Sequence, residues 1–497
     1  MSRATRSAPP RAAAMLESLR GLGYSTAAAL ADIIDNSISA EASEVRVDFH
    51  WAQAASSISI LDNGRGMDDA ELETAMRLGT VNPLQVRAPH DLGRFGMGLK
   101  TASFSQCRRL TVASAKSGST NCLRWDLAEI AANPESDWLL FEGPAPGSEQ
   151  RLDPLQGMAS GTLVLLEDLD RIVTADSAAD DFLDVIDGVE PHLAMVFHRL
   201  LEGPHPRLHL LLNGRPVRAW DPFMAGHPAK PWSSPVARHV EAYGAVEVQC
   251  HVLPHRDKLS DEEFDANAGP QGWTAQQGFY VYRNERLLVA GGWLGLGYPR
   301  AWNREESHRL ARIRLDIPNT ADADWKIDIR KSTAHPPLRL RPWLTALAET
   351  TREKARKVFA YRGSPGPAKG NVPIEQAWRV ERLQAGLRYR IDEAHPSVAA
   401  VLQSAGTLQP LVRSMLRVIE ETVPVQRIWL DTAENKETPR TGFEGEPNAV
   451  VIEVASVLFN DLVGRKGMTI EQARKSMLRT EPFQKYPALV ARLGSEA

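Results

Sequence analysis

The chain has 497 residues, about three times the usual length of a domain, so we expect two to four domains. Its 43% apolar and 24% charged residues are typical of a soluble globular protein and exclude collagen-like rods and acidic disordered tails. Lys+Arg 58 against Asp+Glu 62 gives a formal charge of -4, which excludes a histone-like general binder of polyanions.

The cysteines and apolar runs indicate the compartment. Only three cysteines occur, without CxxC spacing, so we expect a reducing compartment and neither a structural zinc site nor a disulfide framework. No apolar run approaches the roughly 18 to 20 residues of a membrane helix. Residues 1–14 are basic and alanine-rich but lack the apolar core of a secretory signal. We therefore expect a cytoplasmic protein with no membrane contact.

The first 200 residues are typical of an α+β layer. Apolar spacing predicts two helices within residues 12–40, with Ser25 or Thr26 as the N-cap between them. Alternation predicts strands that are mostly antiparallel. The expected strands are residues 45–49, 57–61, 108–113, 122–127 and 162–166.

A second block opens at Leu208, and we place the domains at residues 1–200, 205–362 and 374–497. In the second block we expect strands at 208–212, 246–253, 278–282 and 311–316, a surface loop at 257–272 and a helix at 341–361. The Gly- and Pro-rich stretch 362–373 predicts a linker. Beyond it we expect helices at 378–390 and 398–421, a strand at 427–431 and a last helix starting at the capping box of Thr469.

The first motif that carries chemistry is ADIIDN, residues 31–36, in the second expected helix. Asp32 and Asn36 are four residues apart and share one helix face, with Asp35 beside them. An acid and an amide one turn apart can hold a water molecule and Mg2+, which takes one or two protein oxygens together with phosphate oxygens. The alternative is a solvated polar face of an amphipathic helix.

The second motif is LDNGRGM, residues 61–67, directly after an expected strand. A carboxylate at a strand end, here Asp62, can accept a hydrogen bond from an exocyclic amine that lies close to the backbone of Gly64 and Gly66. The alternative is a tight Asn-Gly turn that the aspartate merely caps.

The third motif is GRFGMGLK, residues 93–100, which runs into a helical segment. Glycines that open a helix let backbone N–H groups approach phosphate oxygens, and the helix dipole adds attraction. Arg94 and Lys100 would add positive charge, although either could equally be a surface residue. A glycine-rich pattern alone is weak evidence, because neither a Rossmann strand nor a Walker Gly-Lys-Ser accompanies it.

These motifs occur in this order and are followed by Gly161 and Thr162. The phrases ALADIIDNSISA, LDNGRGM and GRFGMGLKTAS closely resemble the GHKL (Bergerat-fold) ATPases, and look most like the MORC branch and its prokaryotic relatives. The resemblance is specific over residues 23–166 and weaker over 208–337. It implies a Bergerat-fold α/β sandwich, then a transducer-like, ribosomal S5-like α/β domain, and it leaves the small mixed C-terminal domain unassigned.

The resemblance implies that the first domain binds ATP and Mg2+. Asn36 would ligate Mg2+, Asp62 would receive the adenine amino group, and Thr162 would join Asp62 through water. Residues 68–98 would form a lid. The residues implied to contact the nucleotide are Asn36, Asp62, Gly64, Gly66, Met67, Gly93, Gly96, Gly98, Lys100 and Thr162.

The two implied catalytic residues are Asp32 and Lys331. The family usually has Glu at the position of Asp32, which orients or deprotonates the attacking water. The shorter side chain sets the carboxylate roughly 1 Å back, which can cost on the order of a hundredfold in rate. Lys331 follows an expected alternating strand at 325–330 and would reach the γ-phosphate from the second domain, with Lys326 as the alternative. We therefore expect slow ATP hydrolysis.

Residues 330–390 hold fourteen Lys/Arg against four Asp/Glu, and such a stripe could follow a DNA backbone without reading sequence. The other interpretation is a solvated helix face and a basic linker. The resemblance implies an ATP-dependent homodimer acting on DNA with helicase-like or nuclease partners, as in prokaryotic antiphage or restriction-type systems. The alternatives are a chaperone-type ATPase that clamps proteins and a nucleotide-sensing scaffold with negligible turnover.

Overall fold

The structure is a computed structural model whose chain divides into two compact units, Met1–Gly363 and Ser364–Ala497, which we call the first and second units. It describes residues 10–79, 97–132, 138–241, 244–321, 324–328, 331–360, 375–383, 386–428, 447 and 449–494. The predicted linker at 362–373 lies outside these residues.

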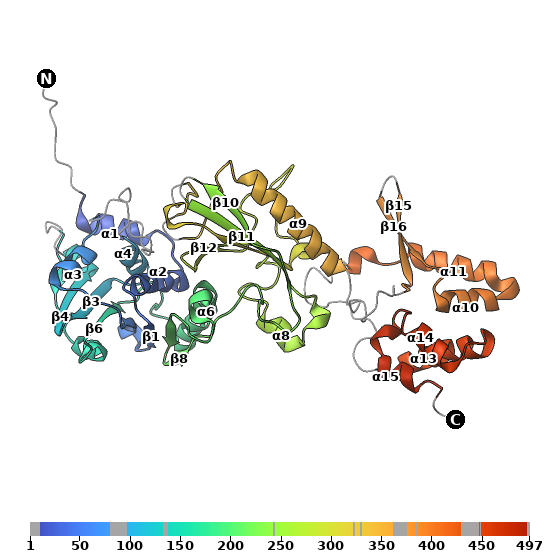
Figure 1. Ribbon diagram of the computed structural model, residues 1–497. Coiled ribbons are helices and arrows are strands. Elements are labelled where there is room, and N and C mark those ends of the chain that lie inside the picture. The colour runs from blue at the N-terminus through green and yellow to red at the C-terminus, as the bar shows by residue number, and fades with distance from the viewer. Residues whose placement is uncertain are drawn as a thin grey trace, which may run out of the picture. The chain divides into compact units, whose positions relative to one another are not determined.

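The first unit begins with an eight-stranded sheet in the order β5-β4-β3-β6-β2-β1-β7-β8. Figure 1 labels β1, β3, β4, β6 and β8 of this sheet. All neighbouring strands are antiparallel except β1 and β7, which are parallel. The strands are β1 (Glu44–His50), β2 (Ser57–Asp62), β3 (Arg109–Lys116), β4 (Ser119–Asp126), β5 (Phe141–Glu142), β6 (Ser160–Glu167), β7 (His209–Leu212) and β8 (Arg215–Pro216). The predicted α+β fold is thus confirmed. However, β7, which the sequence assigned to the second block, joins this first sheet.

Helices pack against one face of this sheet. They are α1 (Ala12–Arg20), α2 (Thr26–Ser39), α3 (Asp69–Met76), α4 (Gly98–Phe104), α5 (Leu127–Ala132), α6 (Ala179–Val196) and α7 (His198–Leu201). Ser25 caps α2 by accepting a hydrogen bond from the Ala28 amide at 3.2 Å. The strands alternate as period-2 patterning requires, so that Ile58 and Ile60 of β2 enter the core with the helices. Leu61 instead faces the opposite side, where the short 3-10 helix η2 (Glu149–Leu155) packs.

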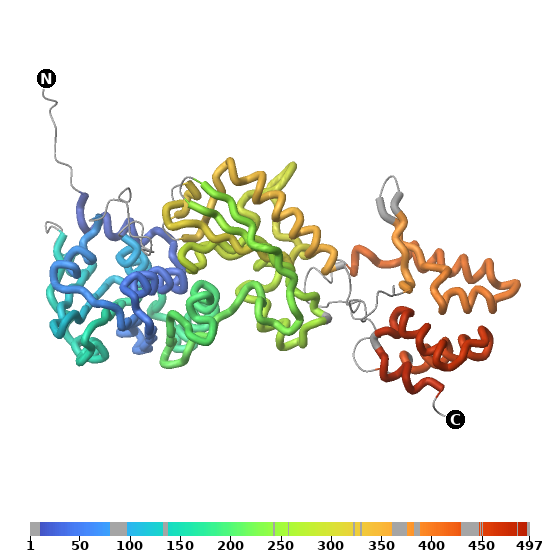
Figure 2. The backbone as a smooth tube through the Cα atoms, viewed as in Figure 1, coloured from blue at the N-terminus to red at the C-terminus, as the bar shows by residue number. Residues whose placement is uncertain are grey.

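A second sheet of the first unit has the order β10-β11-β14-β12-β13, with β9 paired to β11. Its strands are β9 (Trp232–Ser233), β10 (Ala237–Glu241), β11 (Gly244–Val252), β12 (Gly278–Arg283), β13 (Arg286–Ala290) and β14 (Ala311–Asp316). Helix α9 (Arg341–Ala360) runs along β11 and β14 (Figure 2). It buries Leu344, Ala348 and Ala355 in the core of this part of the unit.

Two local predictions for this block were wrong. Residues 257–272 include a short helix, α8 (Asp261–Ala266), because Ser260 and Glu263 form a capping box. Residues 324–328 form a turn and not the strand expected before Lys331. The left-handed backbone at Lys326, with φ 47, is incompatible with an extended strand.

The second unit contains the hairpin β15 (Trp378–Leu383) and β16 (Gly386–Ile391), which replaces the helix predicted at 378–390. Its helices are α10 (Pro396–Ser404), α11 (Gln409–Glu421), α13 (Ala449–Asn460), α14 (Ile470–Met477) and α15 (Pro487–Arg492). The predicted capping box of Thr469 at the start of α14 is confirmed. In the strand predicted at 427–431, Arg427 and Ile428 are helical and the rest lies outside the described residues.

In the part of the chain that the structure describes, none of the helices combines the length and the apolar character that a bilayer crossing requires.

Candidate functional site

The polar face of α2 presents the residues of the first motif. Asp32 and Asp35 are almost completely buried, at 4% and 2% exposure, while Asn36 lies exposed one turn after Asp32. The Asn36 amide nitrogen donates to the backbone oxygens of Asp32 at 3.1 Å and Ile33 at 3.3 Å. These bonds direct the side-chain oxygen of Asn36 away from its own helix. A carbonyl oxygen held in this way fits a hard cation such as Mg2+.

Two cations from the second sheet's side of the unit meet these carboxylates. Lys331 Nζ lies 3.1 Å from Asp32 Oδ1 and also donates to Asp35 Oδ2. Arg286 Nε lies 3.2 Å from both oxygens of Asp35, and Arg286 Nη2 lies 3.3 Å from Asp32 Oδ1. Segments about 250 to 300 residues apart in sequence thus form one buried cluster of two acids and two bases, which we call the four-charge cluster. Lys326, the alternative to Lys331, is exposed.

The cluster perturbs the acid that lies deepest in it. Burial alone would raise the pKa of the Asp35 carboxyl, but the charges and hydrogen bonds of Arg286 and Lys331 bring that pKa below its ordinary value. Asp35 is therefore a carboxylate held by two cations. No sequence motif singles out Arg286, because only tertiary folding brings β13 beside α2.

The second oxygen of Asp32 is occupied as well. Tyr24 lies two residues before the start of α2, and its hydroxyl donates to Asp32 Oδ2 at 3.0 Å. Burial, together with the nearby Asp32 charge, raises the pKa of Tyr24 well above its ordinary value, so the phenol is a donor at neutral pH. Both oxygens of the candidate catalytic base are thus engaged by protein groups in this structure.

Asp62 ends β2 on the face of the sheet that carries the helices. Its carboxylate accepts hydrogen bonds from Ser37 Oγ at 2.8 Å and from the Gly64 amide at 2.9 Å. Burial raises the pKa of Asp62, and the hydrogen bonds from Ser37, Gly64 and the Thr162 backbone partly offset this rise. A carboxylate offers about four acceptor positions, so these three donors leave capacity for a further N–H, as binding an exocyclic amine requires.

The strand register places two hydroxyls beside Asp62. Asp62 pairs with Thr162 on β6, and Thr162 pairs with Ser114 on β3. The Ser114 and Thr162 hydroxyls lie 2.9 Å apart, and Ser114 Oγ accepts from the Met67 amide at 2.8 Å. The structure thus brings together Asp62, Met67 and Thr162 as the sequence predicted. It adds Ser114. The period of two along β3 places Ser114 on the same face as buried Val112, and this pattern could have indicated it in the sequence.

The glycines of the second motif are required by the protein's own packing. Gly66 has φ 67, and a Cβ there would lie 1.9 Å from the Ala115 carbonyl oxygen. A Cβ at Gly64 would lie 2.8 Å from the Ala40 carbonyl oxygen. The expectation that these glycines admit the adenine base stays a prediction, because packing alone accounts for both of them.

The third motif is only partly visible. Gly93, Arg94 and Gly96 lie outside the described residues, whereas Gly98 starts α4 with open space where a Cβ would be. Lys100 is 3% exposed, and its ammonium donates to the Ala75 carbonyl oxygen near the end of α3 at 2.8 Å. Burial lowers the pKa of Lys100 to about 8. The structure therefore excludes one of the two interpretations of Lys100, that of a surface residue.

In the folded chain, some of the basic residues counted in 330–390 are buried or paired with acidic residues. Arg352 is buried with its guanidinium 4.6 Å from the ring centroids of both Trp293 and Trp302, and Arg339 pairs with Glu241 at 2.6 Å. The exposed basic residues of α9 are Lys354, Arg356 and Lys357, whereas Arg341 is half-buried and donates to the Gly295 carbonyl oxygen at 2.6 Å. Arg362 and Lys369 lie outside the described residues.

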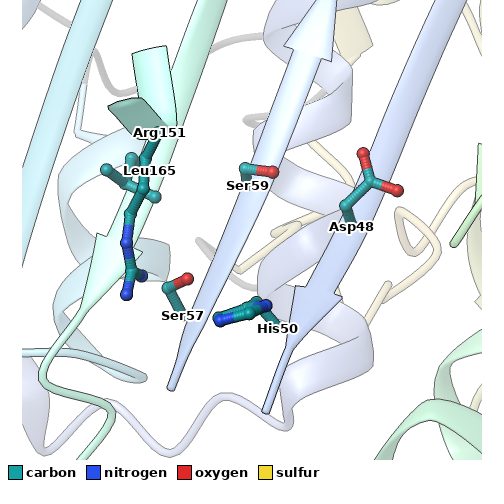
Figure 3. A pocket seen from close by; sticks show the side chains of 6 residues that line it. All are labelled: Asp48, His50, Ser57, Ser59, Arg151 and Leu165. Atoms are coloured by element: carbon teal, nitrogen blue, oxygen red, sulfur yellow. The ribbon is translucent and has the colours of Figure 1, made fainter. Parts of the chain in front are cut away.

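A polar hollow of about 190 Å3 lies on the opposite face of the first sheet (Figure 3). Its lining comes from β1, β2, β6 and η2 and comprises Asp48, His50, Ser57, Ser59, Arg151 and Leu165. Ser57 and Ser59 alternate with Ile58 and Ile60, which face the helices, so the sheet separates this hollow from Asp62. It is distinct from the candidate nucleotide site.

Fold and site together define an α/β sandwich whose acidic helix α2 meets two basic residues from the second sheet's side of the same unit. Residues 24–162 match the family model described as histidine kinase-, DNA gyrase B-, and HSP90-like ATPase. This part of the chain is thus a GHKL-type ATPase domain, and it contains every predicted site residue except Lys331. No curated protein matches the chain.

Proposed function

We propose that the first unit binds Mg-ATP between α2 and the ends of β2, β3 and β6, and hydrolyses it slowly. The observation that supports this most strongly is the contact between Asp32 and Lys331, which are 299 residues apart. Burying charged side chains is costly, and even a buried ion pair often adds no net stability, so stability alone is a weak reason for this contact. A candidate base and a candidate phosphate-binding lysine at one point are what a γ-phosphate site needs.

In this proposal, Asn36 holds Mg2+ through its side-chain oxygen, and Asp62 accepts the adenine amino group. Bound Mg2+ would neutralise phosphate charge. Lys331 would exchange its carboxylate partners for the γ-phosphate, which removes one of the two cations at Asp32 Oδ1 and leaves acceptor capacity there for a proton from water. Asp32 thus becomes available only when the γ-phosphate is present, and the second sheet's domain senses that phosphate through Lys331.

The test is calorimetric binding of ATP and of a nonhydrolysable ATP analogue, followed by phosphate release with and without Mg2+. We expect the wild type to bind both ligands and to release phosphate slowly. Asp32→Asn should keep the binding and lose the release. If the wild type releases phosphate no faster than Asp32→Asn, the protein is a nucleotide-sensing scaffold and not an ATPase. Failure to bind ATP would overturn the proposal.

We further propose that the ATPase belongs to the MORC-like branch, dimerises when it binds ATP and acts on DNA in a defence system. GHKL ATPases commonly dimerise in this way, and the exposed cations Lys354, Arg356 and Lys357 of α9 could contact phosphates. Sedimentation with and without the ATP analogue tests the dimer. Salt-dependent DNA binding under the same conditions separates DNA from the chaperone-type alternative, which predicts no such binding.

A further inference from the structure

The four-charge cluster contains one cation more than the proposed function uses. Lys331 has a role at the γ-phosphate, whereas Arg286 contacts the same two carboxylates without one. Arg286 is the first residue of β13, and its side chain is only 5% exposed. Its neighbours therefore define what it can do.

The two cations differ in how firmly they are held. Arg286 Nε bridges both oxygens of Asp35, its Nη1 donates to the Leu287 carbonyl oxygen at 2.6 Å, and its guanidinium lies 6.0 Å from the ring centroid of Phe197. Lys331 lies outside the strands, in a left-handed conformation with φ 53, and its side chain is 12% exposed. A planar guanidinium with several fixed bonds stays in place, whereas an ammonium on a flexible stem exchanges partners readily.

Charge balance shows why both cations are needed. Asp32 and Asp35 carry two negative charges in a site that is nearly closed to water, and Arg286 and Lys331 neutralise them. When Lys331 leaves for another anion, Arg286 alone still touches both carboxylates. Without Arg286, the departure of Lys331 would leave two buried carboxylates with no cation, which is strongly unfavourable.

We propose that Arg286 is a positioning residue that stays on Asp32 and Asp35 while Lys331 moves to the γ-phosphate. It keeps the second sheet docked on α2 and makes the departure of Lys331 possible. The inference rests on the proposed function, since it assumes that Lys331 binds the γ-phosphate. It predicts that Arg286 matters for ligands that recruit Lys331 and not for those that do not.

The experiment compares two ligands, ADP and the nonhydrolysable ATP analogue, by calorimetry with Mg2+ present. In Arg286→Met, Lys331 is the last cation of the carboxylate pair, so recruiting it should lower the affinity for the ATP analogue about ten- to a hundredfold, within the usual range of site coupling. Affinity for ADP should change less than twofold. A purely structural role would lower both affinities together.

The matched control is Arg199→Met. Arg199 lies on α7 and pairs with Asp316 of β14, so it joins the same two parts of the unit without touching Asp32 or Asp35. It should leave the ratio of the two affinities unchanged. In a Lys331→Met background, Arg286→Met should also leave the ratio unchanged, because no lysine remains to be recruited.

Equal falls in both affinities, or no fall in either, would overturn the role of Arg286. If circular dichroism shows that Arg286→Met is unfolded, the same comparison is made with Arg286→Gln, which keeps a hydrogen-bonding side chain but removes the positive charge. An unchanged ratio there overturns the inference in the same way. Absence of ATP binding by the wild type would instead refute the proposed function, so the two failures are distinguishable.

Discussion

Replacing Asp62 by asparagine distinguishes the hydrogen bonds that stabilise the end of β2 from the hydrogen bond proposed to bind adenine. The Gly64 amide can only donate, so it must keep the oxygen of the new side chain. The new NH2 group then faces Ser37, whose hydroxyl can turn and accept instead of donating. The contacts with Ser37 and Gly64 therefore survive, but the new NH2 group presents a donor where the adenine amino group needs an acceptor.

The magnitude follows from the bond that is lost. A hydrogen bond to a charged group contributes about 1.5–3 kcal/mol, and each 1.4 kcal/mol is tenfold in affinity. We expect Asp62→Asn to weaken binding of the ATP analogue by roughly 10- to 150-fold. Melting should change little, because the substitution is isosteric and the contacts with Ser37 and Gly64 remain.

The assay is calorimetry with the ATP analogue and with inosine triphosphate, which carries an oxygen in place of the amino group. Wild type should prefer ATP, and Asp62→Asn should lose or reverse this preference. Asp48→Asn, on the opposite face of the same sheet, is the matched control and should behave as wild type. Undiminished affinity of Asp62→Asn for the ATP analogue would refute the assignment of Asp62 to the base.

Three further predictions concern Gly66, Gly98 and the buried Lys100. Gly66→Ala should destabilise the fold by at least about 2 kcal/mol in chemical denaturation, since a Cβ would overlap Ala115 and the left-handed backbone disfavours alanine. Gly98→Ala should fold normally, and any loss of ATP affinity would then report a close phosphate; destabilisation by Gly98→Ala instead would contradict the open space seen there. For Lys100, the folded-state pKa of about 8 lies below the ordinary 10.5, so its burial lowers stability below pH 8 and this cost disappears as pH rises to about 10.5. The free energy of unfolding of wild type relative to Lys100→Met should therefore rise by about 3 kcal/mol over that window, and a flat difference would contradict the buried position of the ammonium.

Local patterning predicted most elements of the first unit because their hydrophobic periods are clear. The strand expected at 311–316 is β14, and the helix expected from Arg341 is α9. The 378–390 segment was misassigned although its signal was present. Val380 and Tyr389 pair across the hairpin, and Leu387 and Ile391 continue the period of two that distinguishes strands from helices.

The candidate site, too, was only partly predictable from the sequence. Motif spacing sufficed for Asp62 and Thr162, because both lie at strand ends that pair in register. Arg286 and Tyr24 could not be selected, since neither belongs to a motif and only the docking of β13 and α2 gives them their partners. Contacts that depend on how two layers meet carry no local signal in a single sequence.

The short side chain of Asp32 and the two cations beside it belong to one arrangement. Asp32 is 4% exposed, with Tyr24 at 3.0 Å, Lys331 at 3.1 Å and Arg286 at 3.3 Å from its oxygens. Asp32→Glu restores the residue usual in the family but inserts a methylene into this closed cluster, and overpacking of this kind costs about 1–3 kcal/mol. We therefore expect Asp32→Glu to lower the melting temperature without accelerating phosphate release. Faster release at unchanged stability would mean that the cluster opens in solution, and that side-chain length alone limits the rate.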